Sequence, residues 1–184
     1  MNRIAIPSAD QTPAASKPLL EAVQKQLGVI PNLMKLVGNS PAALHGYLSL
    51  SGALAKGSID IKTGERIALA IAEINACSYC LSAHTYLGKN VAKLDDIELA
   101  ANRKGTSTDP KAAAAVHFAS KVAIERGHVS NTDVQAVKAA GFNDAEIVEI
   151  VLHVALNTLT NYVNEVAQTE IDFPEVKPGL PRVV

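Results

Sequence analysis

The sequence is poor in cysteine, in aromatic residues and in net charge. Of its 184 residues only 2 are cysteine, none is tryptophan, and 4% are aromatic. The formal net charge is −1 and the basic residues form no block, so bulk electrostatics favour neither nucleic acid nor a membrane surface as a partner. Two cysteines that lie close together in such a chain are typical of a catalytic or metal-binding pair rather than of structural disulfides.

Long apolar runs are also missing. The N-terminal stretch MNRIAIPSADQTP lacks the apolar core of a secretory signal. No apolar run approaches the ~20 residues that a membrane-spanning helix needs. We therefore expect a cytoplasmic protein. Hydrophobic residues make up 48% of the chain, which is enough for the core of one domain of ordinary size.

Helix signals follow one another along the whole chain, and no alternating strand pattern interrupts them. Ser40 and Asp60 are predicted N-caps, while Ser130 with Asp133 and Asn143 with Glu146 form predicted capping boxes. Glycines are expected to end several helices, including one closed by Gly88. The expected helices cover residues 18–27, 31–37, 41–56, 61–75, 77–87, 94–103, 110–126, 131–140 and 144–168.

These signals predict an all-α protein, a compact antiparallel helical bundle formed by a single domain over residues 1–184. The last 14 residues, 171–184, read IDFPEVKPGLPRVV and include three prolines, which predicts an extended C-terminal tail from about residue 169. Such a tail is expected either to lie as an arm on a neighbouring subunit or to fray.

The stretch ERIALAIAEINACSYCLSAH, from Glu65 to His84, carries the chemistry. On one helix, Cys77, Cys80 and His84 share a face, because residues three and four apart are neighbours. A separation of three residues places the two cysteines within the usual range for a disulfide. A bridge there closes a very short loop, so it adds little stability and suits redox turnover better than a structural role.

Two features can favour a thiolate, and they point to different sulfurs. Cys77 lies at the expected start of its helix, where the helix dipole favours negative charge. His84 lies one turn beyond Cys80 and can take its proton. A carboxylate that orients this imidazole has two candidates: Glu65, if the helices on either side of Asn75–Cys77 fold into a tight hairpin, and Glu73, which is nearer to Cys77 in sequence.

The spacing of Glu65, Cys77, Cys80 and His84 resembles the signature of the AhpD-like alkylhydroperoxidase group within the carboxymuconolactone decarboxylase family. That signature is Glu, eleven residues, Cys-x-x-Cys, three residues and His, and every spacing is met. The flanking segments resemble the subgroup called peroxidase-related proteins. They are Gly28–Leu54 and Asn161–Val176.

The resemblance implies an AhpD-like fold, a homo-oligomer such as a trimer or hexamer, and a thiol-dependent peroxidase of the alkyl hydroperoxide reductase type. In the family scheme Cys80 attacks the peroxide, Cys77 resolves the sulfenic acid into a disulfide, and His84 and Glu65 relay protons. The cycle needs no bound cofactor. Its partners are a hydroperoxide and an external dithiol, thioredoxin-like or lipoyl reductant. Related peroxidases often have His where this chain has Tyr79, a phenol that is a poor base near neutral pH.

Other readings of these residues stay open. The two cysteines with His84 and Glu65 are also a possible zinc ligand set. A non-enzymatic redox sensor, or an oligomeric binding protein with a switchable CxxC pair, is the alternative function. Tyr79 is expected either to line a substrate pocket or to pack in the core. Asparagines at 157, 161 and 164 share one helix face, and hydrogen bonding between helices is the expected role.

Overall fold

The protein is described here by a computed structural model, in which residues 2–179 are described. That part of the chain forms α-helices and contains no strand, which confirms the predicted all-α class. None of its helices is long and apolar enough to cross a membrane. The helices are α1 (Lys17–Leu27), α2 (Asn32–Val37), α3 (Pro41–Leu54), α4 (Ile61–Ile74), α5 (Ser78–Asn90), α6 (Asp96–Arg103), α7 (Pro110–Ile124), α8 (Asn131–Ala139) and α9 (Asp144–Ala167).

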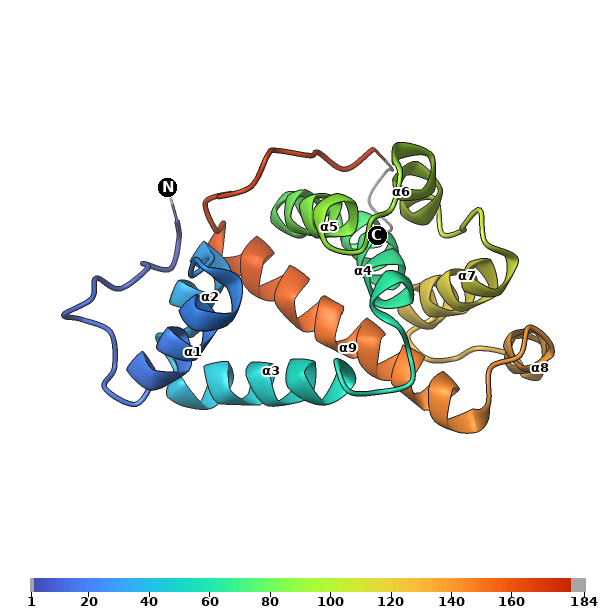
Figure 1. The fold of residues 1–184 in the computed structure, drawn as a ribbon, viewed down its shortest axis with the longest axis horizontal. Coiled ribbons are helices and arrows are strands. Elements are labelled where there is room, and N and C mark those ends of the chain that lie inside the picture. The colour runs from blue at the N-terminus through green and yellow to red at the C-terminus, as the bar shows by residue number, and fades with distance from the viewer. Residues whose placement is uncertain (1, 180–184) are drawn as a thin grey trace.

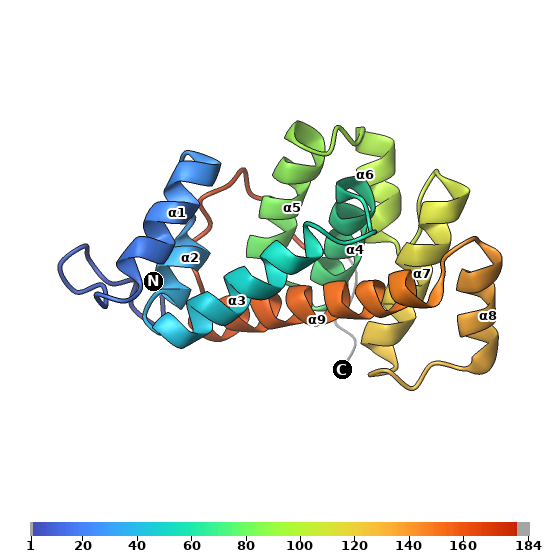
Figure 2. The same cartoon turned by 60° about the horizontal axis from the view of Figure 1, so that its bottom comes forward.

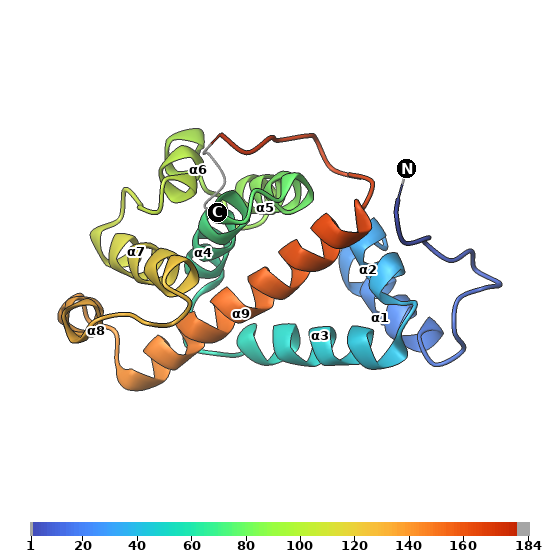
Figure 3. The ribbon, with the colours of Figure 1, turned by 180° about the vertical axis from the view of Figure 1, so that it is seen from behind.

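Helix α4 is the centre of the fold. It packs against α5, α6, α7 and α9, and the side chains of Ile67, Leu69 and Ile71 are fully buried within it. The long helix α9 crosses the molecule behind α4, with α1 and α2 at one end and α7 and α8 at the other (Figures 1 and 3). Helix α3 runs beside α9, as Figure 2 shows. Burial of α4 on several sides fixes the turn that follows it, where the cysteines lie.

The apolar interior has two clusters, one on each side of α4. The first surrounds α5 and includes Leu44, Leu69 and Leu81, together with both cysteines. The second lies between α4, α7 and α9, and it includes Ile67 and Ile150. The cysteine pair is therefore built into the part of the core formed by residues of α1 to α6, with C-terminal residues packed against it.

The predicted N-caps are confirmed. The side chains of Ser40, Asp60, Ser130 and Asn143 each accept a hydrogen bond from the backbone N–H three residues later. Ser130 and Asn143 also form complete capping boxes with the acidic residues at those positions. These bonds satisfy backbone donors that a helix start otherwise leaves without partners.

Gly88 does not end its helix, so that prediction was wrong. Helix α5 continues to Asn90, and Gly88 lies inside it. A Cβ atom at this position would lie 2.9 Å from Cδ2 of Leu99, a residue of α6. The glycine is there because α6 approaches the α5 backbone closely, a tertiary reason that a local stop signal does not reveal.

Residues 169–179, called the C-terminal strap below, are extended and lie on their own chain. Figure 1 shows the strap, in red, running from the end of α9 past α5 towards α6. The backbone N–H of Val176 donates to Oγ of Ser82 at 2.8 Å, and Arg103 donates to the carbonyl of Lys177 at 2.8 Å. The described part of the predicted tail is thus extended and packs on helices of its own chain. Residues 180–184 of the predicted tail lie outside the described residues.

Candidate functional site

The site begins at the turn between α4 and α5. Ala76 has a φ of 52°, the left-handed conformation that reverses the chain, and Cys77 follows as the N-cap of α5. The Cys77 sulfur accepts a hydrogen bond from the backbone N–H of Cys80, with N and Sγ 3.3 Å apart. The prediction that Cys77 starts its helix is therefore confirmed, and its sulfur does the work that Ser or Asp does in other caps.

The two sulfur atoms lie 2.9 Å apart and are free thiols rather than a disulfide. Cys77 donates and Cys80 accepts in this contact. Cys77 is fully buried and Cys80 is 3% exposed, so the pair is shielded from solvent. Because both cysteines belong to one turn of helix, a bond between them needs no movement of distant elements.

The hairpin of α4 and α5 brings Glu65 to His84. The distance between Oε2 of Glu65 and Nδ1 of His84 is 2.9 Å, and both side chains are mostly buried. Glu73, the other candidate, binds elsewhere: its carboxylate accepts from Nε of Arg103 at 2.6 Å and from the backbone N–H of Gly179. Of the two carboxylates, Glu65 is the one that can orient the imidazole.

The surroundings favour the thiolate on Cys80. The hydrogen bond from the Cys77 thiol lowers the pKa of Cys80 most, burial opposes this, and the nearby His84 and Asn164 lower it further. The pKa of Cys77 is raised, first by its hydrogen bond to Cys80 and then by burial. Two sulfurs in contact do not both ionise. The sequence left the choice of sulfur open, and the electrostatics now favour Cys80.

His84 is held ready to carry a positive charge. Burial lowers its pKa, but the Glu65 carboxylate outweighs burial, so the net pKa is raised above the ordinary value. A neighbouring carboxylate favours the protonated ring because the two charges attract. The imidazolium in turn favours negative charge on Cys80, since His84 lowers the pKa of that thiol.

Asn164 of α9 is a site residue that sequence reasoning missed. Its Nδ2 atom donates to Sγ of Cys80 at 3.2 Å, and the residue is 3% exposed. Asn161, one turn earlier, follows the expectation of bonding between helices, because its Oδ1 accepts from Nδ2 of Asn75 at 2.9 Å. The repeated asparagines were a visible signal, but Asn164 and Cys80 are 84 positions apart in the sequence, so no local pattern revealed their contact.

Tyr79 packs in the core, as one of its two expectations had it, and it also lines a hollow. Its hydroxyl accepts from the backbone N–H of Leu33 at 3.1 Å and donates to Oδ1 of Asp172 in the strap at 2.8 Å. Its ring meets Phe173, also in the strap, edge to face with centroids 5.9 Å apart. Burial raises the pKa of this phenol, which makes it a poorer base still.

An open hollow of about 240 Å³ lies at the start of α5, beside the strap. Tyr79, Asn164 and Ile171 contribute to its wall. Cys80 does not line it, but Asn164 touches both the hollow and the Cys80 sulfur. Asn164 therefore links this hollow to the Cys80 sulfur.

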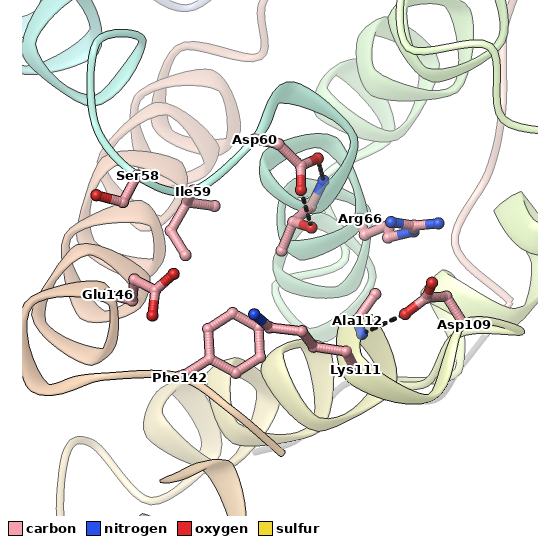
Figure 4. Close-up of a pocket in the computed structure, with 10 residues that line it drawn as sticks. Ser58, Ile59, Asp60, Arg66, Asp109, Lys111, Ala112, Phe142 and Glu146 are labelled. Atoms are coloured by element: carbon pink, nitrogen blue, oxygen red, sulfur yellow. Dashed lines mark hydrogen bonds between the residues drawn. The ribbon is translucent and has the colours of Figure 1, made fainter.

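A second hollow, of about 190 Å³, lies where α4, α7 and α9 begin (Figure 4). Asp60, Asp109 and Glu146 on its wall cap these helices through hydrogen bonds to backbone N–H groups. The Lys111 ammonium lies 4.7 Å from the centre of the Phe142 ring. These charged groups are used in holding the helix starts together, and the cysteines lie at the opposite end of α4.

Cys77, Cys80, His84 and Glu65 are not arranged as a metal site. Among residues 2–179, no group of three or more His, Cys, Asp or Glu side chains is arranged to hold a metal ion. The zinc reading of Cys77, Cys80, His84 and Glu65 therefore lacks the geometry it needs, because a structural zinc ion draws its ligands into one tetrahedron.

Comparison with solved structures identifies the fold. A peroxidase-related protein from Ralstonia eutropha JMP134, described as an alkylhydroperoxidase AhpD core, superposes with a TM-score of 0.82 at 24% identity, covering 93% of this chain and 92% of its own. A peroxidase-related protein from Silicibacter sp. TM1040 superposes with a TM-score of 0.81 at 23% identity, and the match covers 92% of this chain and 91% of that one. A cysteine-to-alanine variant of the debrominase Bmp8, in complex with 2,3,4-tribromopyrrole, superposes with a TM-score of 0.76 at 18% identity. That match covers 92% of this chain and 91% of the debrominase chain.

The fold and the helical CxxC pair thus define an AhpD-like helical protein, as the sequence resemblance implied. Residues 41–121 match the carboxymuconolactone decarboxylase family, and this segment contains Glu65, both cysteines and His84. No curated protein matches the chain by sequence. Over residues 41–121 the chain is similar to the carboxymuconolactone decarboxylase family, and its fold is that of the AhpD-like structures.

Proposed function

We propose that the protein is a thiol-dependent peroxidase that reduces organic hydroperoxides with its CxxC pair. The observation that carries the proposal is the contact of 2.9 Å between the two sulfurs, with the His84–Glu65 pair close enough to favour a Cys80 thiolate. A thiolate beside a second thiol and an imidazolium is the arrangement that two-cysteine reduction of a peroxide requires.

In the proposed cycle the Cys80 thiolate attacks the terminal oxygen of the hydroperoxide. The S–O bond forms as the O–O bond breaks, the sulfur is oxidised by two electrons, and the peroxide is reduced to an alkoxide. Protonated His84 supplies the proton that converts the alkoxide to an alcohol. The Cys77 thiol then displaces water from the sulfenic acid, which gives the Cys77–Cys80 disulfide.

An external dithiol closes the cycle by thiol–disulfide exchange, which returns two electrons and two protons to the pair. We propose a thioredoxin-like or lipoyl dithiol for this role. Because thiols stay reduced in the cytoplasm, the cycle also favours that compartment. Both sulfurs are buried, so we expect the hydroperoxide to approach through the hollow lined by Tyr79, Asn164 and Ile171.

Thiol titration before and after peroxide tests the proposal. Reduced wild type treated with cumene hydroperoxide is expected to lose two thiols per chain and to release cumyl alcohol. Cys80→Ser is expected to lose none, while Cys77→Ser is expected to stop at a sulfenic acid, which dimedone traps. The proposal fails if reduced wild type reacts no faster than Cys80→Ser.

We further propose that the protein is a homo-oligomer, a trimer or a hexamer. An apolar stripe runs along one exposed face of α9, because its residues recur at steps of three, four and seven residues, which keep side chains on one face of a helix. Exposed stripes of this kind mark contact sites. Its residues are Val148, Val151, Leu152, Leu159, Tyr162 and Val166.

Light scattering tests the assembly. We expect wild type to give a multiple of the 19.3 kDa chain mass, and Leu159→Glu on the stripe to lower it. Ile97→Glu is the matched control, because Ile97 is exposed on α6, away from the stripe. A monomeric wild type would contradict the proposal. The stripe also supports the alternative of a redox switch, which predicts that assembly differs between oxidised and reduced protein without peroxide turnover.

A further inference from the structure

Asn164 has one polar atom engaged and one atom without a partner. Its Nδ2 donates to the Cys80 sulfur, whereas its Oδ1 is buried and has no hydrogen-bond partner among the described residues. Buried acceptors are nearly always paired, so an unpaired one beside a reactive sulfur calls for an explanation. The hollow reaches Asn164 but not Cys80, which places this amide between the space outside and the thiol.

A second amide on the same helix also faces the sulfur. Asn161 lies one turn before Asn164, and its Oδ1 accepts from Asn75. Its Nδ2 is directed at Cys80, since a hydrogen bond from Asn161 lowers the pKa of that thiol. The Oδ1 atom of Asn164 is therefore the amide atom beside the sulfur that is left to accept a hydrogen bond from a ligand.

We infer that Asn164 positions the hydroperoxide: its Nδ2 holds the Cys80 sulfur while its Oδ1 accepts the hydrogen bond of the terminal O–H group. This inference rests on the proposed peroxidase function and names the substrate feature that the site recognises. Because both atoms belong to one planar amide, the sulfur and the terminal oxygen are held side by side in the order that the attack needs.

The chemistry of the step is unchanged and remains balanced. The S–O bond forms to the terminal oxygen, which keeps its hydrogen and becomes the sulfenic O–H, still bound to Oδ1 of Asn164. The O–O bond breaks, two electrons pass from sulfur to the peroxide, and His84 protonates the departing alkoxide. Selectivity follows: an oxidant that carries an O–H donor is favoured over an electrophile of similar reactivity that carries none.

The experiment compares two reagents on the same variants. Cumene hydroperoxide carries the O–H group, while methyl methanethiosulfonate reacts with the thiolate but carries no hydrogen-bond donor. For Asn164→Ala we expect the rate with the hydroperoxide to fall about tenfold further than the rate with the thiosulfonate, the factor that one typical hydrogen bond contributes. Asn164→Ser is the second variant, since its shorter side chain does not reach both groups but leaves a smaller gap in the core.

Asn157→Ala is the matched control, because Asn157 is a buried asparagine on the same helix that bonds to the backbone of His153. It should change neither rate. Equal losses with both reagents in the Asn164 variants would overturn the inference and leave a role on the thiolate alone. No loss with either reagent would overturn it as well. If wild type itself fails to consume the hydroperoxide, the proposed function fails, and that result is read before any variant is compared.

Discussion

Removing the Tyr79 hydroxyl measures how much its hydrogen bonds to α2 and to the C-terminal strap contribute to the free energy of unfolding. In Tyr79→Phe the buried backbone N–H of Leu33 loses its acceptor, and Asp172 loses one of its two donors. A buried donor left without a partner costs about 1–3 kcal/mol. Asp172 is exposed, so water replaces the bond that it loses. We therefore expect the free energy of unfolding to fall by about 2 kcal/mol, nearly all of it from Leu33.

Thermal and urea denaturation measure this change. For a chain of this size, 1 kcal/mol lowers the melting temperature by about 2–4 °C, so the expected fall is roughly 4–8 °C. Tyr86→Phe is the matched control, because the Tyr86 ring also contacts Phe173 but is 44% exposed. Its effect should stay within about 0.5 kcal/mol. Equal stability of the two variants would refute the reasoning that a buried hydroxyl ties α2 and the strap to α5.

Three further outcomes follow. The rate at which a thiol reagent labels Cys80 should rise with pH around a midpoint of about 7, and Cys77→Ala should move that midpoint upward because it removes the strongest hydrogen bond to the thiolate. Since Glu65 raises the pKa of His84, the pair stabilises the fold fully below about pH 6.5 and loses this as pH rises through the folded pKa. Glu65→Gln should remove this loss in denaturation at several pH values, because burial, which lowers the pKa, is then opposed by Cys80 alone. Asn143→Ala should cost about 1 kcal/mol in urea denaturation.

Local signals predicted the helices well, because capping chemistry is written in a few adjacent residues. Asp60 and Asn143 mark their helix starts in the sequence and cap them in the structure. Gly88 misled the prediction, since its reason is the approach of α6 rather than a turn. The strap was predicted to be extended because of its prolines, but its contacts with α5 depend on tertiary packing and were not readable from its own residues.

The candidate site also combines residues that the sequence could reveal locally with residues that only tertiary packing brings together. Residues on one helical hairpin are close in sequence, so Glu65 was one of the two carboxylates considered for His84, and the structure selects it over Glu73. Asn164 comes from a helix near the other end of the chain, so no local spacing links it to Cys80. Tyr79 was noticed in the sequence because related peroxidases often have His there. Its bonds to α2 and the strap join segments far apart in the chain, so they depend on tertiary packing.

The position of Tyr79 between the two cysteines gives the protein a built-in optical signal. With no tryptophan in the chain, its ultraviolet emission comes from 4 tyrosines, and one of them lies in the turn that holds both sulfurs. A disulfide quenches a phenol beside it, so closing and opening the bridge should dim and restore the intensity. Each oxidation and reduction can then be followed in real time in the unlabelled, unmodified protein.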